Sequence, residues 1–136
     1  RAIASRLDGW AGQQGQRVQV HTSLGQLRYL SLMAAADAVV GNSSSGLYEA
    51  PSLGVPTVDI GDRQRGRLAA ASVLHCAPER AAIAASIRQA LALDCRGTVN
   101  PYGDGHSAAR IVAALRALPP AAQLLRKPFH LIGATP

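Results

Sequence analysis

The sequence predicts an α/β fold in which one sheet of parallel strands carries helices on both faces. Short apolar segments of strand length alternate along the chain with longer segments whose apolar residues recur every three or four positions. Strands that alternate with helices in this way pair in parallel and are joined by right-handed crossovers. The 136 residues, 48% of them hydrophobic, are enough for one such domain with its own core and too few for two.

Five helices are predicted from the spacing of apolar residues. The first covers residues 1–14, where Ile3, Leu7 and Trp10 share one face, and Gly15 is suited to end it. The others are expected at residues 24–36, 45–53, 81–93 and 108–118.

Four strands are predicted from short apolar runs bounded by turn residues. They are expected at residues 17–21, 37–40, 56–60 and 72–75. The first of them alternates polar and apolar side chains, as a half-buried strand does. After the last helix, Pro119 and Pro120 stop regular structure, so we expect a domain of residues 1–118 and a C-terminal tail of residues 119–136.

The net charge of +6 indicates an anionic ligand. It comes from thirteen arginines and one lysine against eight acidic residues, and arginine makes two-pronged hydrogen bonds to phosphate and carboxylate. Most arginines stand singly, and the dense cluster is Arg63, Arg65 and Arg67. Because the sequence has neither a basic stripe nor interleaved aromatic residues, nucleic acid is not expected as a partner.

The apolar runs and the cysteines indicate the cellular location of the protein. Charged residues such as Asp37 and Arg88 interrupt the longest apolar runs well before the roughly 20 residues that a membrane span needs, so no membrane partner is expected. Cys76 and Cys95 form neither a CxxC nor a Cys/His pattern, which favours free thiols, no bound metal and a cytoplasmic protein. The chain opens within a helical pattern and without a signal peptide, which indicates a fragment.

The first candidate site is the Gly-Asn-Ser-Ser-Ser-Gly loop at residues 41–46, which follows a predicted strand and begins a helix. Ligands of parallel sheets lie outside the carboxyl ends of the strands, and helix starts rich in hydroxyl groups bind anions such as phosphate. Glu49, one turn further, can accept two hydrogen bonds from a ribose. The alternative is a tight turn in which Asn42 or a serine caps the helix and Glu49 is solvated. The loop matches neither dinucleotide nor P-loop motifs.

The second candidate site is the loop of residues 61–67, which follows the next predicted strand. If the strands are neighbours, its arginines face the same crevice and can neutralise a diphosphate; the alternative is an exposed basic turn. Tyr29 can pack on a nucleobase or be an ordinary half-buried tyrosine. Four histidines lack a partner at a spacing that indicates catalysis or metal binding, and we expect them to be bystanders: His21, His75, His106 and His130.

A long motif resembles the UDP-N-acetylglucosamine 2-epimerase family. It is VGNSSSGLYEAPSLGVPTVDIGDRQRGR at residues 40–67, and the likeness continues at residues 71–74 and 100–105, so that it covers most of residues 17–118. The form GDRQxGR is similar to the UDP-hydrolysing branch of the family, which releases N-acetylmannosamine for sugars of the sialic-acid type. Asp59, His75 and Ala69 depart from the Asn, Asp and basic residue that many members carry.

The resemblance implies the C-terminal half of a GT-B-type enzyme made of two Rossmann-like domains, with UDP-N-acetylglucosamine or UDP as ligand. The N-terminal domain of the same protein is then the implied partner, and homo-oligomers are compatible because dimers are common in the family. The implied diphosphate ligands are Ser43 and Ser44, the implied ribose ligand is Glu49, and Arg63 belongs to the same site. Asn42 and Gly46 in the motif are further candidates, and Tyr29 is another because it lies near the place where some members carry an aromatic residue beside uracil.

The implied reaction is an anti elimination of UDP through 2-acetamidoglucal, followed by addition of water with inversion at C2. No metal or redox cofactor is implied. The family's acid and base groups lie upstream of this chain, so we expect no catalytic residue in it and no turnover by it alone. Two other interpretations stay open: half of a GT-B glycosyltransferase, and a non-catalytic module that binds sugar nucleotides.

Overall fold

The computed structural model describes residues 2–125. The chain forms two compact units, Arg1–Pro101 and Tyr102–Pro136, and each is considered by itself. The first unit contains the sheet and both candidate loops. None of the helices in the described part is long and apolar enough to cross a membrane.

A parallel sheet of three strands, in the order β1-β2-β3, is the centre of the first unit. The strands are β1 (Val39–Gly41), β2 (Thr57–Ile60) and β3 (Val73–Cys76). The register pairs Val40 with Val58, and Val58 with Leu74. β2 is buried along most of its length, as expected of a central parallel strand that is covered on both faces.

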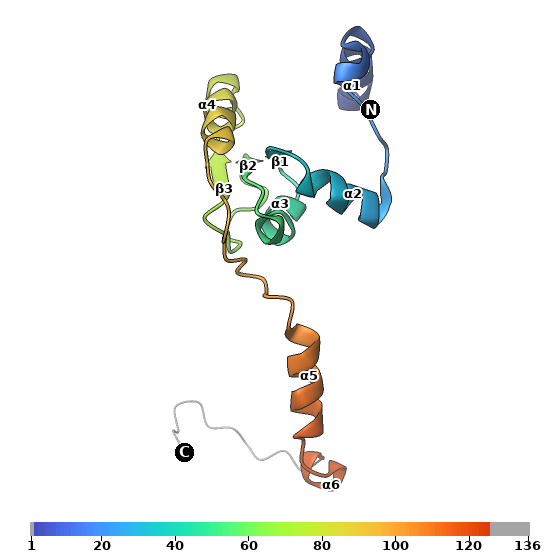
Figure 1. The fold of residues 1–136 in the computed structure, drawn as a ribbon, viewed down its shortest axis with the longest axis vertical. Helices are drawn as coiled ribbons and strands as arrows, with labels where there is room; N and C mark the ends of the chain where they lie inside the picture. The colour runs from blue at the N-terminus through green and yellow to red at the C-terminus, as the bar shows by residue number, and fades with distance from the viewer. Residues whose placement is uncertain (1, 126–136) are drawn as a thin grey trace. The chain divides into compact units, whose positions relative to one another are not determined.

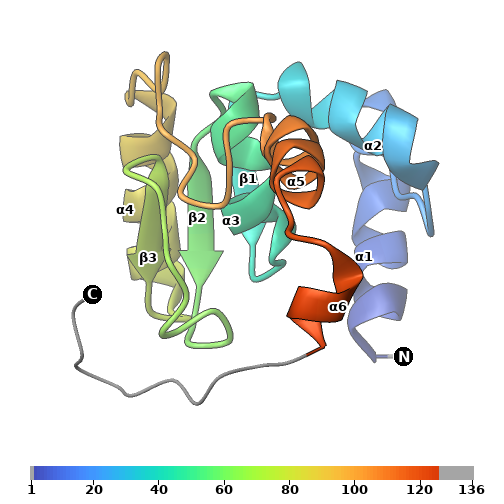
Figure 2. The same ribbon diagram turned by 90° about the horizontal axis from the view of Figure 1, so that it is seen from below.

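Helices cover both faces of this sheet. They are α2 (Gly25–Ala34), α3 (Ser45–Tyr48), which continues into the short 3₁₀-helix η2 (Ala50–Leu53), and α4 (Arg80–Leu91). Seen along the strands, α3 lies on one face and α4 on the other (Figure 1), and the view from below shows α3 in front of the sheet and α4 behind it (Figure 2). The predicted Rossmann-like α/β fold is confirmed.

The core lies where α2 and η2 meet the sheet. Met33, Ala50 and Val55 form a buried cluster, against which Val39 packs. Leu47 lies on α3, which packs against the sheet, and its side chain is fully buried. Apolar burial of this kind supplies most of the stabilisation of a small domain.

One predicted strand is wrong. Residues 17–21 form no strand; the 3₁₀-helix η1 (Gly15–Arg17) follows α1 (Ala2–Gln13), and the chain then runs without regular structure. Val18 is only half-buried and Val20 is 51% exposed. The side chains of residues 17–21 do alternate between polar and apolar, but β1 is an edge strand of the sheet, and in the part of the chain that the structure describes no strand pairs with these residues.

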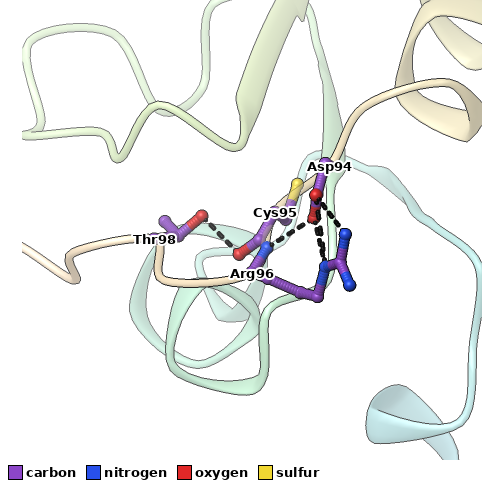
Figure 3. Close-up of polar contacts among 4 residues, drawn as sticks. All are labelled: Asp94, Cys95, Arg96 and Thr98. Atoms are coloured by element: carbon purple, nitrogen blue, oxygen red, sulfur yellow. Dashed lines mark hydrogen bonds and ion pairs between the residues drawn. The ribbon is translucent and has the colours of Figure 1, made fainter.

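A tight turn follows α4 (Figure 3). Cys95 is buried there, and its carbonyl accepts hydrogen bonds from the amide of Thr98 at 3.2 Å and from its hydroxyl at 2.7 Å. Burial raises the pKa of the Cys95 thiol. Arg96 binds the exposed carboxylate of Asp94 through its guanidinium and its backbone amide. Both cysteines are free thiols.

The second unit contains α5 (Ser107–Arg116) and α6 (Ala121–Leu124). Asp104 organises the start of α5, since it accepts from the amide of His106 and pairs with Arg110. This pairing, with Arg110 as the main cause, lowers the pKa of Asp104. α5 confirms the helix predicted over residues 108–118. The part of the expected tail at residues 126–136 lies outside the described residues.

Candidate functional site

The loops that follow β1 and β2 meet at the carboxyl edge of the sheet. Gln64 donates a hydrogen bond of 2.7 Å from Nε2 to the backbone carbonyl of Asn42, and Arg63 donates one of 3.4 Å from Nη1 to the Asn42 side-chain oxygen. Parallel neighbouring strands bring these ends together, as the sequence predicted. Both candidate loops therefore belong to one site.

A chain of hydroxyl groups links α2 to the serine loop. Tyr29 Oη lies 2.6 Å from Ser45 Oγ, which lies 3.1 Å from Ser43 Oγ. Since Ser45 has one hydroxyl proton and donates it to Ser43, Tyr29 is the donor to Ser45. Tyr29 is thereby held beside the serine loop.

Ser43 and Ser44 differ in the hydrogen bonds that their side chains make within the chain. Ser43 Oγ accepts a 3.4 Å hydrogen bond from the amide of Ser45, so the local capping interpretation holds in part for Ser43. Ser44 stands at the N-cap position of α3, but its side chain makes no capping bond. The Ser44 hydroxyl has no hydrogen-bond partner among the described residues, which leaves it available to a ligand.

Glu49 lies at the end of α3, one turn beyond the serines. Its side chain is exposed and makes no hydrogen bond or ion pair with the described residues. On the neighbouring residue, Tyr48 Oη accepts a 3.1 Å hydrogen bond from Arg67, whose guanidinium also stacks 5.6 Å above the Tyr48 ring. The site thus combines hydroxyl donors, the Arg63 guanidinium and one unpaired carboxylate, and Arg67 lies beside it on the Tyr48 ring.

Gly46 permits the loop to approach the sheet. A Cβ atom built on Gly46 would lie 2.5 Å from Thr57 Cγ2, closer than real contacts allow. Thr57 also donates a 3.0 Å hydrogen bond from its hydroxyl to the Gly46 carbonyl. Gly46 therefore positions α3 against β2 through its lack of a side chain.

Sequence reasoning missed several residues that hold the site together. Gln64 is 2% exposed and joins the two loops, although the motif only indicated its arginine neighbours. Asn100 lies in the second segment of the likeness and was not singled out, yet its amide donates to the Tyr48 carbonyl at 2.8 Å and to Ser52 Oγ at 2.6 Å. The sequence carries no signal for Gln64, because a glutamine in a polar loop is ordinarily exposed.

His75 has a hydrogen-bond partner that its spacing in the sequence did not indicate. Its Nδ1 lies 2.9 Å from Oδ2 of the buried Asp59, because the register of β2 and β3 pairs these two residues. His21 Nε2 lies 3.2 Å from the side-chain oxygen of Gln19, two residues away. His106 is exposed, and His130 lies outside the described residues.

Comparison with known proteins identifies the family. The family model described as UDP-N-acetylglucosamine 2-epimerase matches residues 1–116. The GDP/UDP-N,N'-diacetylbacillosamine 2-epimerase (hydrolyzing) of Campylobacter jejuni is 40% identical over 68 residues, 50% of this chain and 18% of that protein. The UDP-N,N'-diacetylbacillosamine 2-epimerase (hydrolyzing) of Legionella pneumophila is 32% identical over 110 residues, 81% of this chain and 29% of that protein.

A third relative, the UDP-N-acetylglucosamine 2-epimerase of Neisseria meningitidis, is 43% identical over 65 residues, 48% of this chain and 17% of that protein. The chain spans less than a third of the length of each of these three relatives. The family match nevertheless covers most of this chain, including the sheet and both loops of the site. The chain belongs to the UDP-N-acetylglucosamine 2-epimerase family.

Proposed function

We propose that this chain is the UDP-binding part of a hydrolysing UDP-N-acetylglucosamine 2-epimerase, which converts UDP-N-acetylglucosamine to N-acetylmannosamine and UDP in amino-sugar biosynthesis. Family membership and two relatives named as hydrolysing enzymes support it. The observation that carries it is the double contact at Asn42, where Arg63 and Gln64 join the arginine loop to the serine loop. Free thiols fit a cytoplasmic location.

Each group in the site suits one part of UDP. The hydroxyls of Ser43 and Ser44 donate to the diphosphate, and Arg63 neutralises its charge. The unpaired carboxylate of Glu49 accepts hydrogen bonds from the two ribose hydroxyls. The ring of Tyr29, fixed by its bond to Ser45, offers a surface for the uracil.

In the reaction, UDP leaves C1 of the sugar while a proton leaves C2, which gives 2-acetamidoglucal. Water then adds across the double bond with inversion at C2 and yields N-acetylmannosamine. This chain contributes at the leaving group, where Arg63 and the hydroxyl donors stabilise the negative charge that develops on the diphosphate. The groups that move the protons belong to an N-terminal domain of a GT-B enzyme, so none is assigned to this chain.

Two substitutions in the intact protein test the site. Ser44→Ala and Glu49→Ala should each weaken UDP binding by about 1–3 kcal/mol, the effect of losing a charged or buried hydrogen bond. Ser86→Ala and Glu79→Ala, on or beside α4 on the opposite face of the sheet, are matched controls and should leave the affinity unchanged. Isothermal titration calorimetry with UDP measures all four, and unchanged affinity in both site variants would sink the assignment.

A second substrate deserves testing because two relatives carry it in their names. The Campylobacter and Legionella proteins are named as N,N'-diacetylbacillosamine 2-epimerases. The uridine diphosphate is common to both sugar nucleotides, so the contacts proposed here serve either. Release of UDP from each sugar nucleotide, followed with the intact protein, identifies the sugar by the higher kcat/KM.

A further inference from the structure

A second cleft lies at the carboxyl ends of β2 and β3. It has a volume of about 730 Å³ and is lined by residues of the loop 61–67 and by the segment 75–78 that ends β3. Clefts of this size accommodate small organic ligands. None of the five residues assigned above to UDP lines it, although it borders the same loop.

The lining carries an excess of positive charge. Arg65 is exposed and its guanidinium makes no hydrogen bond or ion pair with the described residues. Arg67 uses one N–H on Tyr48 and keeps its other donors. Asp62 is the carboxylate in the lining, so two guanidinium groups face one negative charge. The cleft is therefore suited to an anion.

Gln64 adds an independent indication of a ligand. It lines the cleft and is 2% exposed, and its Nε2 is bound to the Asn42 carbonyl. Its Oε1 is buried and has no hydrogen-bond partner among the described residues. A buried acceptor without a donor is unfavourable, so a ligand group that donates a hydrogen bond would complete it.

His75 also lines the cleft and presents a donor or acceptor at a fixed position. Its Nδ1 is bound to the buried carboxylate of Asp59, so the ring orientation is set and Nε2 is the nitrogen left for a ligand. The His75 side chain is 51% exposed, unlike Asp59 at 2%. The wall thus offers a polar contact at a defined position.

We propose that this cleft binds a phosphate monoester that carries hydroxyl groups, such as a sugar phosphate, at a site separate from that of UDP. A monoester is close to doubly charged at neutral pH, which matches the two arginines. Arg65 and Arg67 hold the phosphate, and Gln64 accepts from a ligand hydroxyl. His75 contacts the ligand through Nε2. The proposal goes beyond the UDP site and does not depend on it.

Cys76 supplies the readout because it lines the cleft and is partly exposed. In the intact protein, alkylation of Cys76 by iodoacetamide is followed by mass spectrometry of its peptide. Glucose 6-phosphate should slow this alkylation several-fold and saturably, inorganic phosphate should do so more weakly, and glucose should have no effect. Buried Cys95, with its raised thiol pKa, is the internal control whose slow rate should not change.

Variants separate this site from the UDP site. Arg65→Gln should abolish the protection by glucose 6-phosphate, whereas Ser44→Ala and the charge-matched surface control Arg88→Gln should retain it. Calorimetry with glucose 6-phosphate is a second readout, in which Arg65→Gln should weaken binding about tenfold. No protection and no heat with glucose 6-phosphate would overturn the proposal, as would protection that survives Arg65→Gln. Protection by UDP alone, lost in Ser44→Ala, would instead assign the cleft to the nucleotide.

Discussion

Gly46 shows how the absence of one side chain positions the serine loop. Because its Cβ would lie 2.5 Å from Thr57 Cγ2, Gly46→Ala must push α3 away from β2. We expect the free energy of unfolding to fall by about 1–3 kcal/mol, the usual effect of inserting a methyl group into a packed contact. Urea denaturation measures it.

The matched control for this substitution is Gly9→Ala. Gly9 is in the helix α1, and nothing lies within 4 Å of a Cβ built there. Alanine at this position should stabilise slightly, because it favours helices over glycine by roughly 1 kcal/mol. Equal stability of Gly46→Ala and the parent chain would show that the loop does not need this close approach.

The pKa of the Asp94 carboxyl group depends mainly on one neighbouring residue, Arg96. The Arg96 side chain is the main cause that lowers the pKa of Asp94 from 3.8 to about 2, with the Arg96 amide as a second cause. A depressed folded-state pKa stabilises the fold above pH 3.8, and this stabilisation is lost as the pH falls from 3.8 to about 2.

Arg96→Gln tests this cause at Asp94. The substitution removes the guanidinium but keeps the backbone amide, so the pKa of Asp94 should rise toward 3.8 without reaching it. Carboxyl carbon chemical shifts, followed by NMR from pH 5 to pH 1.5 or below, about the range over which such a carboxylate titrates, give the value directly. Arg88→Gln, on α4, should leave the titration of Asp94 unchanged. A midpoint for Asp94 that is the same in Arg96→Gln and the parent chain would show that the ion pair does not form in solution.

At the scale of elements, helices and buried strands were predictable from the sequence, and the strand at residues 17–21 was not. In helices such as α4 the apolar residues recur every three or four positions, and β2 carries Val58 and Ile60 between the turn residues Pro56 and Gly61. Residues 17–21 alternate correctly, but a strand also needs a neighbour to pair with. Their side chains stay largely exposed instead.

The candidate site was predictable only in its loops. The serine and arginine loops follow strands, and the parallel order of β1 and β2 brings them together. The bonds that fix the site depend on positions distant in sequence: Gln64 reaches Asn42, and Asp59 meets His75 through the register. Spacing along the chain carries no information about these pairs.

Gln64 holds the two loops together through its hydrogen bond to the Asn42 carbonyl. Gln64→Ala removes the 2.7 Å bond to the Asn42 carbonyl and leaves that group without its side-chain donor. We expect stability to fall by about 1–3 kcal/mol and amide exchange in residues 62–67 to accelerate. Hydrogen exchange with mass spectrometry measures the second effect. Gln89→Ala, on the exposed side of α4, is the control. Unchanged amide exchange in Gln64→Ala would show that this hydrogen bond does not hold the two loops together.

At the scale of the molecule, the site proposed for UDP is open to solvent. The side chains proposed to hold UDP include the exposed Ser43, Glu49 and Arg63. Elimination of UDP needs acid and base groups within hydrogen-bond reach of C2 and of the leaving oxygen, and closure of a site excludes competing water. This chain, which spans less than a third of its three relatives, supplies groups that bind and none that we assign to proton transfer.

The 136-residue polypeptide alone should therefore bind UDP and release none from UDP-N-acetylglucosamine. Far-UV circular dichroism first confirms that it is folded, and calorimetry then measures UDP binding. A coupled assay for UDP, with the intact protein as the positive control, tests turnover under the same conditions. Because binding energy without positioned acid and base groups does not lower the barrier to elimination, binding without turnover is the expected result. Catalytic release of UDP by the folded polypeptide would place the proton-transfer groups within these residues.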